Sequence, residues 1–245
     1  MSFSIVQVLI TLVLAVVGVS ALGISGGEIP PLAFAIPALW LLPKGRAAAW
    51  LLLFALGLYA LVLPYQPLAL SISVWTLLPL FMVVYSYKSS KEVVGMLTAV
   101  ILAMEAGIIA LQYEGNLGGK PVYTLIQIAA VIMVWFAARS WRKIDGNLWL
   151  PLLVVIPLCM AGMTHAALAM LCVTGIIVSM QSISTSKNVK WSSSLSWLLP
   201  VIAFATFVVL PQYEVPNPVL ISWFMILISG WATDFMMYVG EGEDQ

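Results

Sequence analysis

The sequence has few charged residues, one histidine and two cysteines. Of its 245 residues, 8% are charged and 62% are hydrophobic, whereas a soluble domain carries about 25% charged residues. Ten acidic and ten basic side chains cannot cover a globule of this size in water, which excludes an ordinary soluble domain and a disordered chain. Two cysteines cannot build a disulfide framework. A net charge of zero provides no basic face for nucleic acid.

Long apolar runs are what the sequence does contain, and a membrane-spanning helix needs about 20 such residues. Turns rich in proline, glycine and charge divide the chain into ten runs. We therefore expect an all-α, polytopic helical membrane protein, one integral membrane domain over residues 1–245, with about ten short transmembrane helices arranged as serial hairpins. The expected helices are residues 4–24, 31–42, 47–63, 68–87, 93–111, 122–138, 148–162, 165–181, 195–210 and 219–238.

Two of these runs have unusual lengths. Residues 148–181 would form a helix of about 50 Å, which exceeds a hydrocarbon core of ~30 Å. Gly162 lies in its only polar stretch, so we expect a hairpin that folds there. The run 31–42 is short and contains Pro37. A re-entrant half-helix is an alternative for it, tolerated only where other helices bury it.

The basic residues predict the orientation of the chain. With ten crossings, nine of the ten basic residues fall in alternate turns, and only Lys120 falls on the other side. Positive residues favour cytoplasmic loops. We therefore expect both termini in the cytoplasm and the chain in the plasma membrane, which for a bacterium is the inner membrane. The expected partner is the lipid bilayer, with no nucleic acid. A membrane protein partner or a homo-oligomer is left open.

A repeat is suggested by two similar segments. Residues 50–64 align without a gap to residues 197–211, with six of fifteen positions identical. The offset of 147 residues corresponds to six helices, so the related hairpins would run in the same direction. Many transporters contain internal repeats. The alternative is a chance match, because apolar helices resemble one another.

Glu105 is the most informative polar residue, because it lies twelve residues into the expected helix 93–111. That places it about 18 Å from the end of the helix. A carboxylate at this depth is costly unless it is protonated, paired or wetted. We interpret Glu105 as a site for a proton, a cation or a solute amine. The alternative is a protonated side chain bonded to a neighbouring helix that approaches closely at Ala106 and Gly107.

Other candidate solute- or ion-binding residues lie at or near the ends of the expected helices. Asp234, near the end of the last helix, would pair with Arg139 or Lys187 or be hydrated. Acidic side chains in the outer turns would line a vestibule that attracts cations, or would simply be solvated. The candidates in the outer turns are Glu28, Glu114, Glu214 and His165.

Soft metal ligands surround the expected hairpin at Gly162. Cysteine, methionine and histidine suit Cu(I), but no Cys-x-x-Cys or His-x-x-x-His spacing is present. We therefore expect no metal and no cofactor. These side chains are expected to fill space between helices, and a soft-metal site is the alternative. The residues concerned are Cys159, Met163, His165 and Cys172.

Scattered polar residues within the expected helices are typical of helix packing, and they support a cavity only weakly. They include Ser71, Gln112, Thr124 and Gln127.

The function expected from these features is that of a multi-pass transporter or permease for a small solute, coupled to a proton or cation. The sequence contains no His-Glu-x-x-His and no phosphate-binding Gly-x-x-x-x-Gly-Lys motif, and we expect no catalytic residues. Two alternatives remain: a non-catalytic membrane subunit of a larger complex, and an intramembrane enzyme that acts on a lipid.

Overall fold

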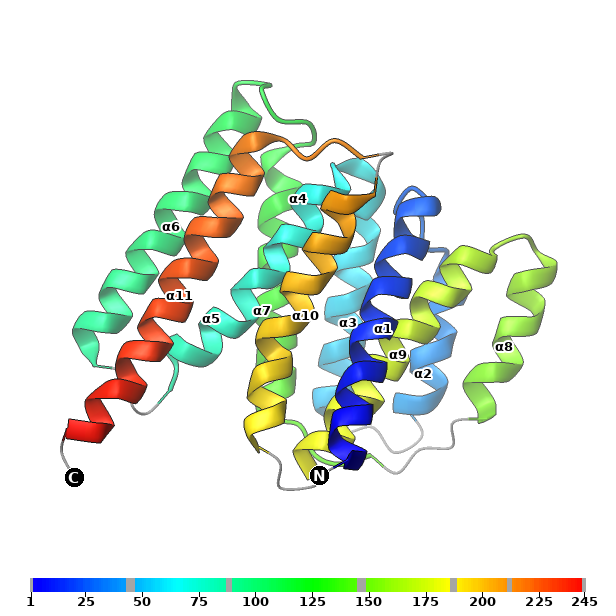
Figure 1. Ribbon diagram of the computed structural model, residues 1–245. Helices are drawn as coiled ribbons and strands as arrows, with labels where there is room; N and C mark the ends of the chain where they lie inside the picture. The colour runs from blue at the N-terminus through cyan, green and yellow to red at the C-terminus, as the bar shows by residue number, and fades with distance from the viewer. Residues whose placement is uncertain are drawn as a thin grey trace.

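The computed structural model describes residues 2–42, 47–86, 90–144, 149–185, 189–210 and 213–243. This part of the chain is helical and contains no strand. Ten helical segments run alternately up and down, with both chain ends at the lower end of Figure 1. The longer helices are α1 (Ser2–Ile24), α3 (Ala47–Val62), α6 (Lys91–Tyr113), α7 (Pro121–Arg139), α9 (Thr164–Thr185), α10 (Val189–Val209) and α11 (Asn217–Glu243).

The remaining segments are shorter or interrupted. The 3-10 turn η1 (Pro31–Phe34) continues into α2 (Ala35–Leu41), and η2 (Leu63–Tyr65) extends α3. Helix α8 (Trp149–Met160) is also short. One segment has three parts: α4 (Leu68–Ser73), η3 (Val74–Thr76) and α5 (Leu77–Val84).

The all-helical fold class is confirmed, and a helix lies at each of the ten expected ranges, with ends shifted by a few residues. Local chemistry explains the ends. The Ser90 side chain accepts a hydrogen bond from the Val93 amide and caps α6, as serine at this position commonly does. Gly162 adopts a φ of 77° in the turn between α8 and α9, a conformation that favours glycine. The expected hairpin at Gly162 is therefore present.

In the part of the chain that the structure describes, six segments are long and apolar enough to cross a membrane. Four further apolar segments are shorter, with 10 to 17 residues in each. Length and composition thus define a multi-pass helical membrane protein, and the expectation of ten crossings remains a prediction for the shorter segments. The six long segments are Ile5–Ile24, Ala47–Tyr65, Lys91–Tyr113, Pro121–Arg139, Thr164–Thr185 and Asn217–Phe235.

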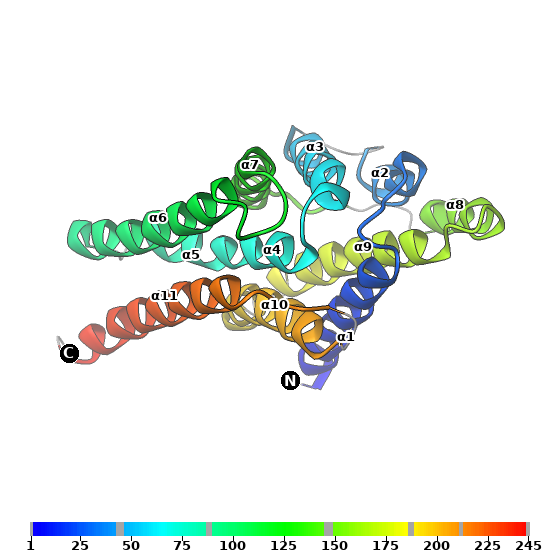
Figure 2. The same cartoon turned by 90° about the horizontal axis from the view of Figure 1, so that it is seen from above.

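The most extensive helix contacts join segments that are far apart in the chain. Helix α1 packs along α9, α3 along α7, α6 along α11, and α2 along α8. Helix α10 packs against both α1 and α4. Figure 2 shows α6 and α11 side by side at one end of the molecule, and α2 and α8 at the other. Sequential hairpins therefore describe the path of the chain, whereas the packing is mainly between its two halves.

These pairs follow a simple rule when the segments are numbered one to ten. Exchanging each segment with the one five places along the chain converts the α1–α9 pair into the α7–α3 pair. The same exchange converts the α1–α10 pair into the pair of α7 with the α4–α5 segment. Three pairs are unchanged by the exchange, because their two members are counterparts of each other: α6–α11, α2–α8 and α4–α10. Two contacts depart from this rule. The contact of α2 with α9 and that of α11 with the α4–α5 segment lack equally extensive counterparts, which would be α8 with α3 and α6 with α10. The packing thus relates the first five segments to the last five.

The two halves have opposite directions, because five is an odd number of segments. Helix α1 rises from the lower end of Figure 1, whereas its counterpart α7 descends from the upper end. Counterpart segments also have similar lengths: α2 and α8 are both short, and α6 and α11 are both long. This arrangement is that of an inverted repeat.

The sequence carries a trace of this repeat at an offset of 120 residues. The segment Phe-Ser-Ile-Val-Gln-Val at residues 3–8 aligns with Tyr-Thr-Leu-Ile-Gln-Ile at residues 123–128. Gln7 matches Gln127, and each of the other five positions pairs residues of similar chemistry. The packing therefore favours an inverted repeat offset by five segments over the parallel repeat, offset by six, that residues 50–64 and 197–211 suggest.

Candidate functional site

The fourth segment is interrupted in its middle, where it crosses the centre of the molecule. The 3-10 turn Val74–Thr76 separates α4 from α5 and contacts α7, α10 and α11. A 3-10 stretch inside a helix often marks a hinge or a strained sequence. The Trp75 side chain packs against three separate clusters of buried residues. The Tyr59 ring lies edge-on to Trp75, with 5.2 Å between ring centroids.

Three hydroxyl groups bond to backbone carbonyls around this interruption. Tyr59 of α3 donates to the Ser71 carbonyl over 2.6 Å. Ser73 donates to the Leu70 carbonyl, and Thr76 donates to the Ser73 carbonyl, each over 2.7 Å. Hydroxyls that bond to the preceding turn bend helices, and neighbouring side chains satisfy backbone groups where a membrane helix is broken. These contacts stabilise the interruption.

The counterpart segment, α10, is one continuous helix with an internal proline. It contains Pro200 near its middle, and an internal proline removes a backbone hydrogen bond and kinks the helix. The short pair α2 and α8 contains Pro37 and Pro157. In membrane proteins built from inverted repeats, short or proline-interrupted segments at corresponding positions are the best pointer to a binding site. The candidate functional site is therefore the centre of the molecule, where the α4–η3–α5 segment packs on α10.

A group of polar side chains is buried above this centre, toward the upper end of Figure 1. Its members come from the turn before α4, from α4 itself, from the last turn of α6, and from the first two turns of α7. Each member is at most 7% exposed. We call this group the glutamine cluster: Gln66, Ser71, Gln112, Thr124 and Gln127.

Hydrogen bonds connect all five members of the glutamine cluster. The Gln66 side-chain amide donates to the Gln127 carbonyl oxygen, and the Gln127 amide donates to Ser71 Oγ over 2.8 Å. Thr124 Oγ1 lies 2.7 Å from Gln112 Oε1 and 3.3 Å from Gln66 Oε1. Buried polar side chains are costly unless they are bonded in this way. The cluster thus ties α4, α6 and α7 together at the upper end.

The sequence pattern indicated a role in helix packing for four of these five side chains, and it did not single out Gln66. No spacing rule connects Gln66 with Gln127, because 61 residues separate them. The alignment of residues 3–8 with residues 123–128 is the sequence signal that singles out Gln127, since it pairs that residue with Gln7.

Glu105 lies on α6, outside the central segments. The buried stripe of α6 consists of Leu97, Ile101, Ile108 and Gln112, and Glu105 lies at its edge and is partly buried. Among the described residues it has no hydrogen-bond or ion-pair partner. The close approach expected at Ala106 and Gly107 is absent, because both are exposed and a Cβ on Gly107 would meet no atom of the chain within 4 Å. The binding role expected for Glu105 remains a prediction.

Asp234 lies on α11, the counterpart of α6. It is also partly buried and lies beside the stripe that includes Ile226, Gly230 and Thr233. The structure shows no ion pair between Asp234 and Arg139, whose guanidinium lies 5.5 Å from the centroid of the Trp135 ring. Lys187, the other expected partner, lies outside the described residues. Each half of the chain therefore carries a partly buried carboxyl group in its fifth segment.

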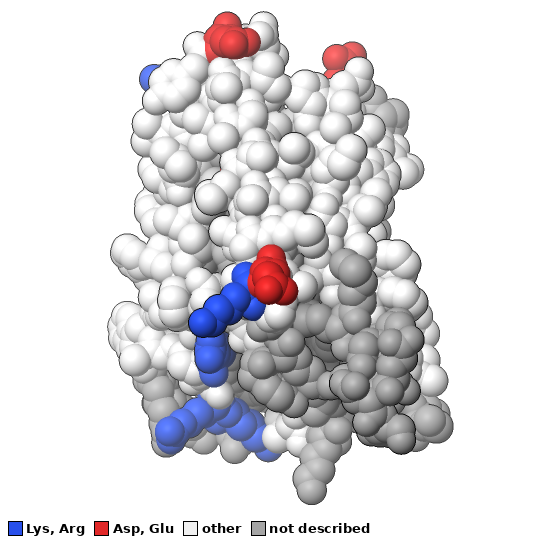
Figure 3. Space-filling view, turned by 90° about the vertical axis from the view of Figure 1, so that its left-hand side faces the viewer, with Lys and Arg blue, Asp and Glu red and all other residues white. Residues whose placement is uncertain are grey.

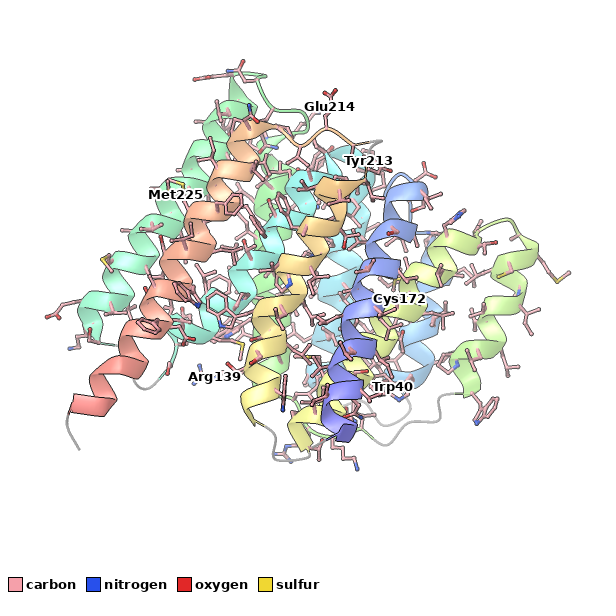
Figure 4. All side chains as sticks on the ribbon, in the orientation of Figure 1. Trp40, Arg139, Cys172, Tyr213, Glu214 and Met225 are labelled. Carbon is pink, nitrogen blue, oxygen red and sulfur yellow. The ribbon has the colours of Figure 1, made fainter. Side chains whose placement is uncertain are left out.

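The candidates in the outer turns share one end of the molecule but stay apart. All four are exposed, and Asn116 donates a hydrogen bond to the Glu114 carboxylate over 2.9 Å. Figure 3 shows separate acidic groups on the upper edge, above a broad uncharged band. Figure 4 places Glu214 at this end and Arg139 near the opposite one. These candidates are Glu28, Glu114, Glu214 and His165.

The four side chains of the alternative soft-metal site do not all lie together. Cys172 is buried on α9, and its Cβ lies 3.0 Å from the position of a Cβ built on Gly18 of α1; Figure 4 shows it in this region. Cys159, Met163 and His165 are exposed around the α8–α9 turn. The described residues contain no group of three or more His, Cys, Asp or Glu that could hold a metal ion. Cys172 therefore acts as a small packing residue.

Comparisons of the chain with protein-family models, curated proteins and solved structures give no match. The class that the structure defines is a multi-pass helical membrane protein with an inverted five-segment repeat and an interrupted central segment.

Trp223 provides a test of packing near the site. Its indole N–H is buried and has no hydrogen-bond partner among the described residues, while its ring stacks on Phe204 with 4.4 Å between centroids. Trp223→Phe keeps the stack and removes the unpaired donor, so we expect a change in the midpoint of thermal unfolding within about 2 °C. Trp223→Ala should lower the midpoint by more than about 5 °C, because it leaves a cavity. Equal losses in both variants would contradict this account of the indole.

Proposed function

We propose that the protein is a multi-pass transporter for a small solute, which binds where the α4–η3–α5 segment packs on α10. The observation that carries this proposal is the 3-10 turn within the α4–η3–α5 segment together with the internal proline of α10, because these two segments occupy corresponding places in the inverted repeat. Transporters of this architecture bind solutes at the interface between the repeats, beside interrupted helices. The opposite directions of the two halves provide the symmetry that alternating access requires.

The chemistry of the centre supports a solute that is recognised without a formal charge on the protein. Hydroxyls and aromatic rings surround the interruption, including Tyr59, Ser73, Trp75 and Thr76. The intramembrane carboxyl groups Glu105 and Asp234 lie on α6 and α11 instead. Hydrogen bonding and ring contacts orient a polar solute in such a site. Coupling to a proton or cation through Glu105 is a separate part of the proposal.

A ligand screen followed by uptake tests the proposed function. Purified protein is screened for thermal stabilisation by amino acids, sugars, nucleosides, amines and organic acids, because a ligand that binds the native state raises its stability. A stabilising compound is then supplied in radioactive form to proteoliposomes. We expect saturable uptake and exchange of labelled for unlabelled compound. Stabilisation without uptake or exchange would reject transport and indicate a binding role.

Replacement of Trp75 tests where the solute binds. Trp75→Phe should weaken stabilisation by the compound at least threefold, whereas Trp231→Phe, a change at an exposed site on α11, should leave it unchanged. Equal effects of the two variants would reject the central site.

Both termini are proposed to lie in the cytoplasm, with the chain in the plasma membrane. The support is the distribution of basic residues and the position of both ends of the chain at the end opposite Glu214. In a cysteine-free background, cysteines at Ser90 and Thr185 should react with a membrane-impermeant maleimide only from the cytoplasmic side. A cysteine at Asn116 should react only from outside. Labelling of Asn116 and Ser90 from the same side would reject this orientation.

A further inference from the structure

The two halves carry matching hydrogen bonds at opposite ends of the molecule. At the upper end, Gln127 in the first turns of α7 bonds with Gln66, just after the α3–η2 segment. At the lower end, Gln7 in the first turns of α1 donates to Ser182, near the end of α9, over 2.9 Å. Since α1 is the counterpart of α7, and α9 of α3, these bonds occupy equivalent positions in the inverted repeat.

Apolar packing accompanies the bond at the lower end. Val8, Ile183 and Leu195 form a buried cluster that joins α1, α9 and α10. The glutamine cluster joins the counterpart segments, because its members come from α7, α4 and the turn after η2. The lower end is therefore closed by α1, α9 and α10, and the upper end by their counterparts α7, α3 and α4. At the upper end α6 takes part as well, through Gln112.

The two closures differ in strength. The glutamine cluster contains four side-chain contacts within hydrogen-bonding distance, and its members are buried. The lower closure has one side-chain hydrogen bond between Gln7 and Ser182, and that bond is exposed. A hydrogen bond in a dry environment is electrostatically stronger than one in contact with water. The polar contacts of the glutamine cluster are therefore stronger than the bond between Gln7 and Ser182.

We infer that the glutamine cluster is the upper gate of the proposed transporter, and that Gln7, Ser182 and the Val8 packing form its lower gate. The inference rests on the proposed function and adds the residues that control access. In a protein built from inverted repeats, one half rocks against the other around a fixed site, so the two gates open in turn. The structure represents the state with the upper gate locked.

Labelling of two buried reporters tests the gates without a solute. In a cysteine-free background, Ala130→Cys reports on the upper end, since Ala130 lies one turn beyond Gln127 and is 1% exposed. Val8→Cys reports on the lower end, where Val8 is 5% exposed. Purified protein in lipid nanodiscs reacts with a water-soluble maleimide that reaches both ends. The labelling rate follows the population of the open state when opening and closing are fast.

Gln127→Leu removes the bonds to Gln66 and Ser71 at similar side-chain size. We expect the rate at Ala130→Cys, divided by the rate at Val8→Cys, to rise at least tenfold, which corresponds to about 1.4 kcal/mol. The rate at Val8→Cys should stay equal or fall, because the open upper gate excludes the open lower gate. Gln66→Leu should act in the same direction, and it replaces Gln127→Leu if that variant does not fold.

Gln7→Leu is the matched control, since it removes the equivalent bond from the other half. It should change the ratio of the two rates in the opposite direction. A rise of the labelling rate at both reporter cysteines in the glutamine variants would show general loosening and would overturn the gates. An unchanged ratio of the two labelling rates, in a variant with the wild-type unfolding midpoint, would overturn them as well. Because no solute is present, this result is independent of uptake, and a failure of uptake counts against transport instead.

Discussion

Gly18→Leu is expected to lower the midpoint of thermal unfolding by about 5 to 10 °C. Gly18 lies in α1 against α9, and a Cβ built on it lies 3.0 Å from Cys172 Cβ. A leucine adds three further carbons to a contact that is already tight, so the two helices must separate. Small residues let membrane helices approach closely, and this pair of helices has the most extensive contact in the fold.

Two comparisons separate this packing effect from a general effect of leucine. Gly107→Leu on α6 meets open space and should leave the midpoint within about 2 °C. Cys172→Gly, added to Gly18→Leu, removes the opposing side chain and should restore part of the loss. The measurement is thermal unfolding of the purified variants in one detergent. Equal losses in Gly18→Leu and Gly107→Leu would contradict the close packing of α1 on α9.

Glu105→Gln is expected to reduce coupled uptake at least tenfold without a change in the unfolding midpoint. Glutamine preserves the shape and the hydrogen-bonding capacity of glutamate, but it cannot ionise. If Glu105 exchanges a proton or cation during transport, uptake by the wild type should depend on the imposed gradient and on pH, and uptake by the variant should not. The measurement is uptake of the compound found in the screen, in proteoliposomes with and without a proton gradient.

Controls for this prediction come from the same helix and from its counterpart. Glu92→Gln changes an exposed carboxyl group in the first turn of α6 and should leave uptake unchanged. Asp234→Asn changes the corresponding carboxyl group of α11 and should reduce coupling if the two carboxyls act together. Equal rates and equal pH profiles in the wild type and Glu105→Gln would remove Glu105 from the mechanism. Transport would then depend on the central site alone.

The positions of the helices were predictable because their causes are local. Runs of apolar residues bounded by glycine, proline and charge predicted all ten segments, including the short helix at residues 31–42. The hairpin at Gly162 followed from the length of its apolar run and from the thickness of a bilayer, about 30 Å. The interruption at Val74–Thr76 was not predicted, since its cause is a set of contacts that includes Tyr59 from another segment.

The offset of the repeat suggested by the sequence differs from the one that the packing favours, for a physical reason. Leucine and valine matches are frequent between apolar helices, and the identities between residues 50–64 and 197–211 are mostly of this kind. The match of residues 3–8 to residues 123–128 has only one identity, at Gln7 and Gln127. Its significance appears once α1 and α7 are recognised as counterparts by their packing.

By itself, the sequence determined the class of protein, the limits of its helices and the end of the molecule at which each turn lies. The tertiary structure decided which helices pack together, where the halves meet, and that Gln66 and Gln127 bond across 61 residues. It also placed Glu105 at the edge of a stripe on α6 rather than in the centre. The reason is that a membrane helix is apolar on the face that meets lipid and on the face that meets protein. Hydrophobic periodicity therefore does not identify its buried side, and helix partners follow from the shapes and polar groups of faces that come together only in the folded chain.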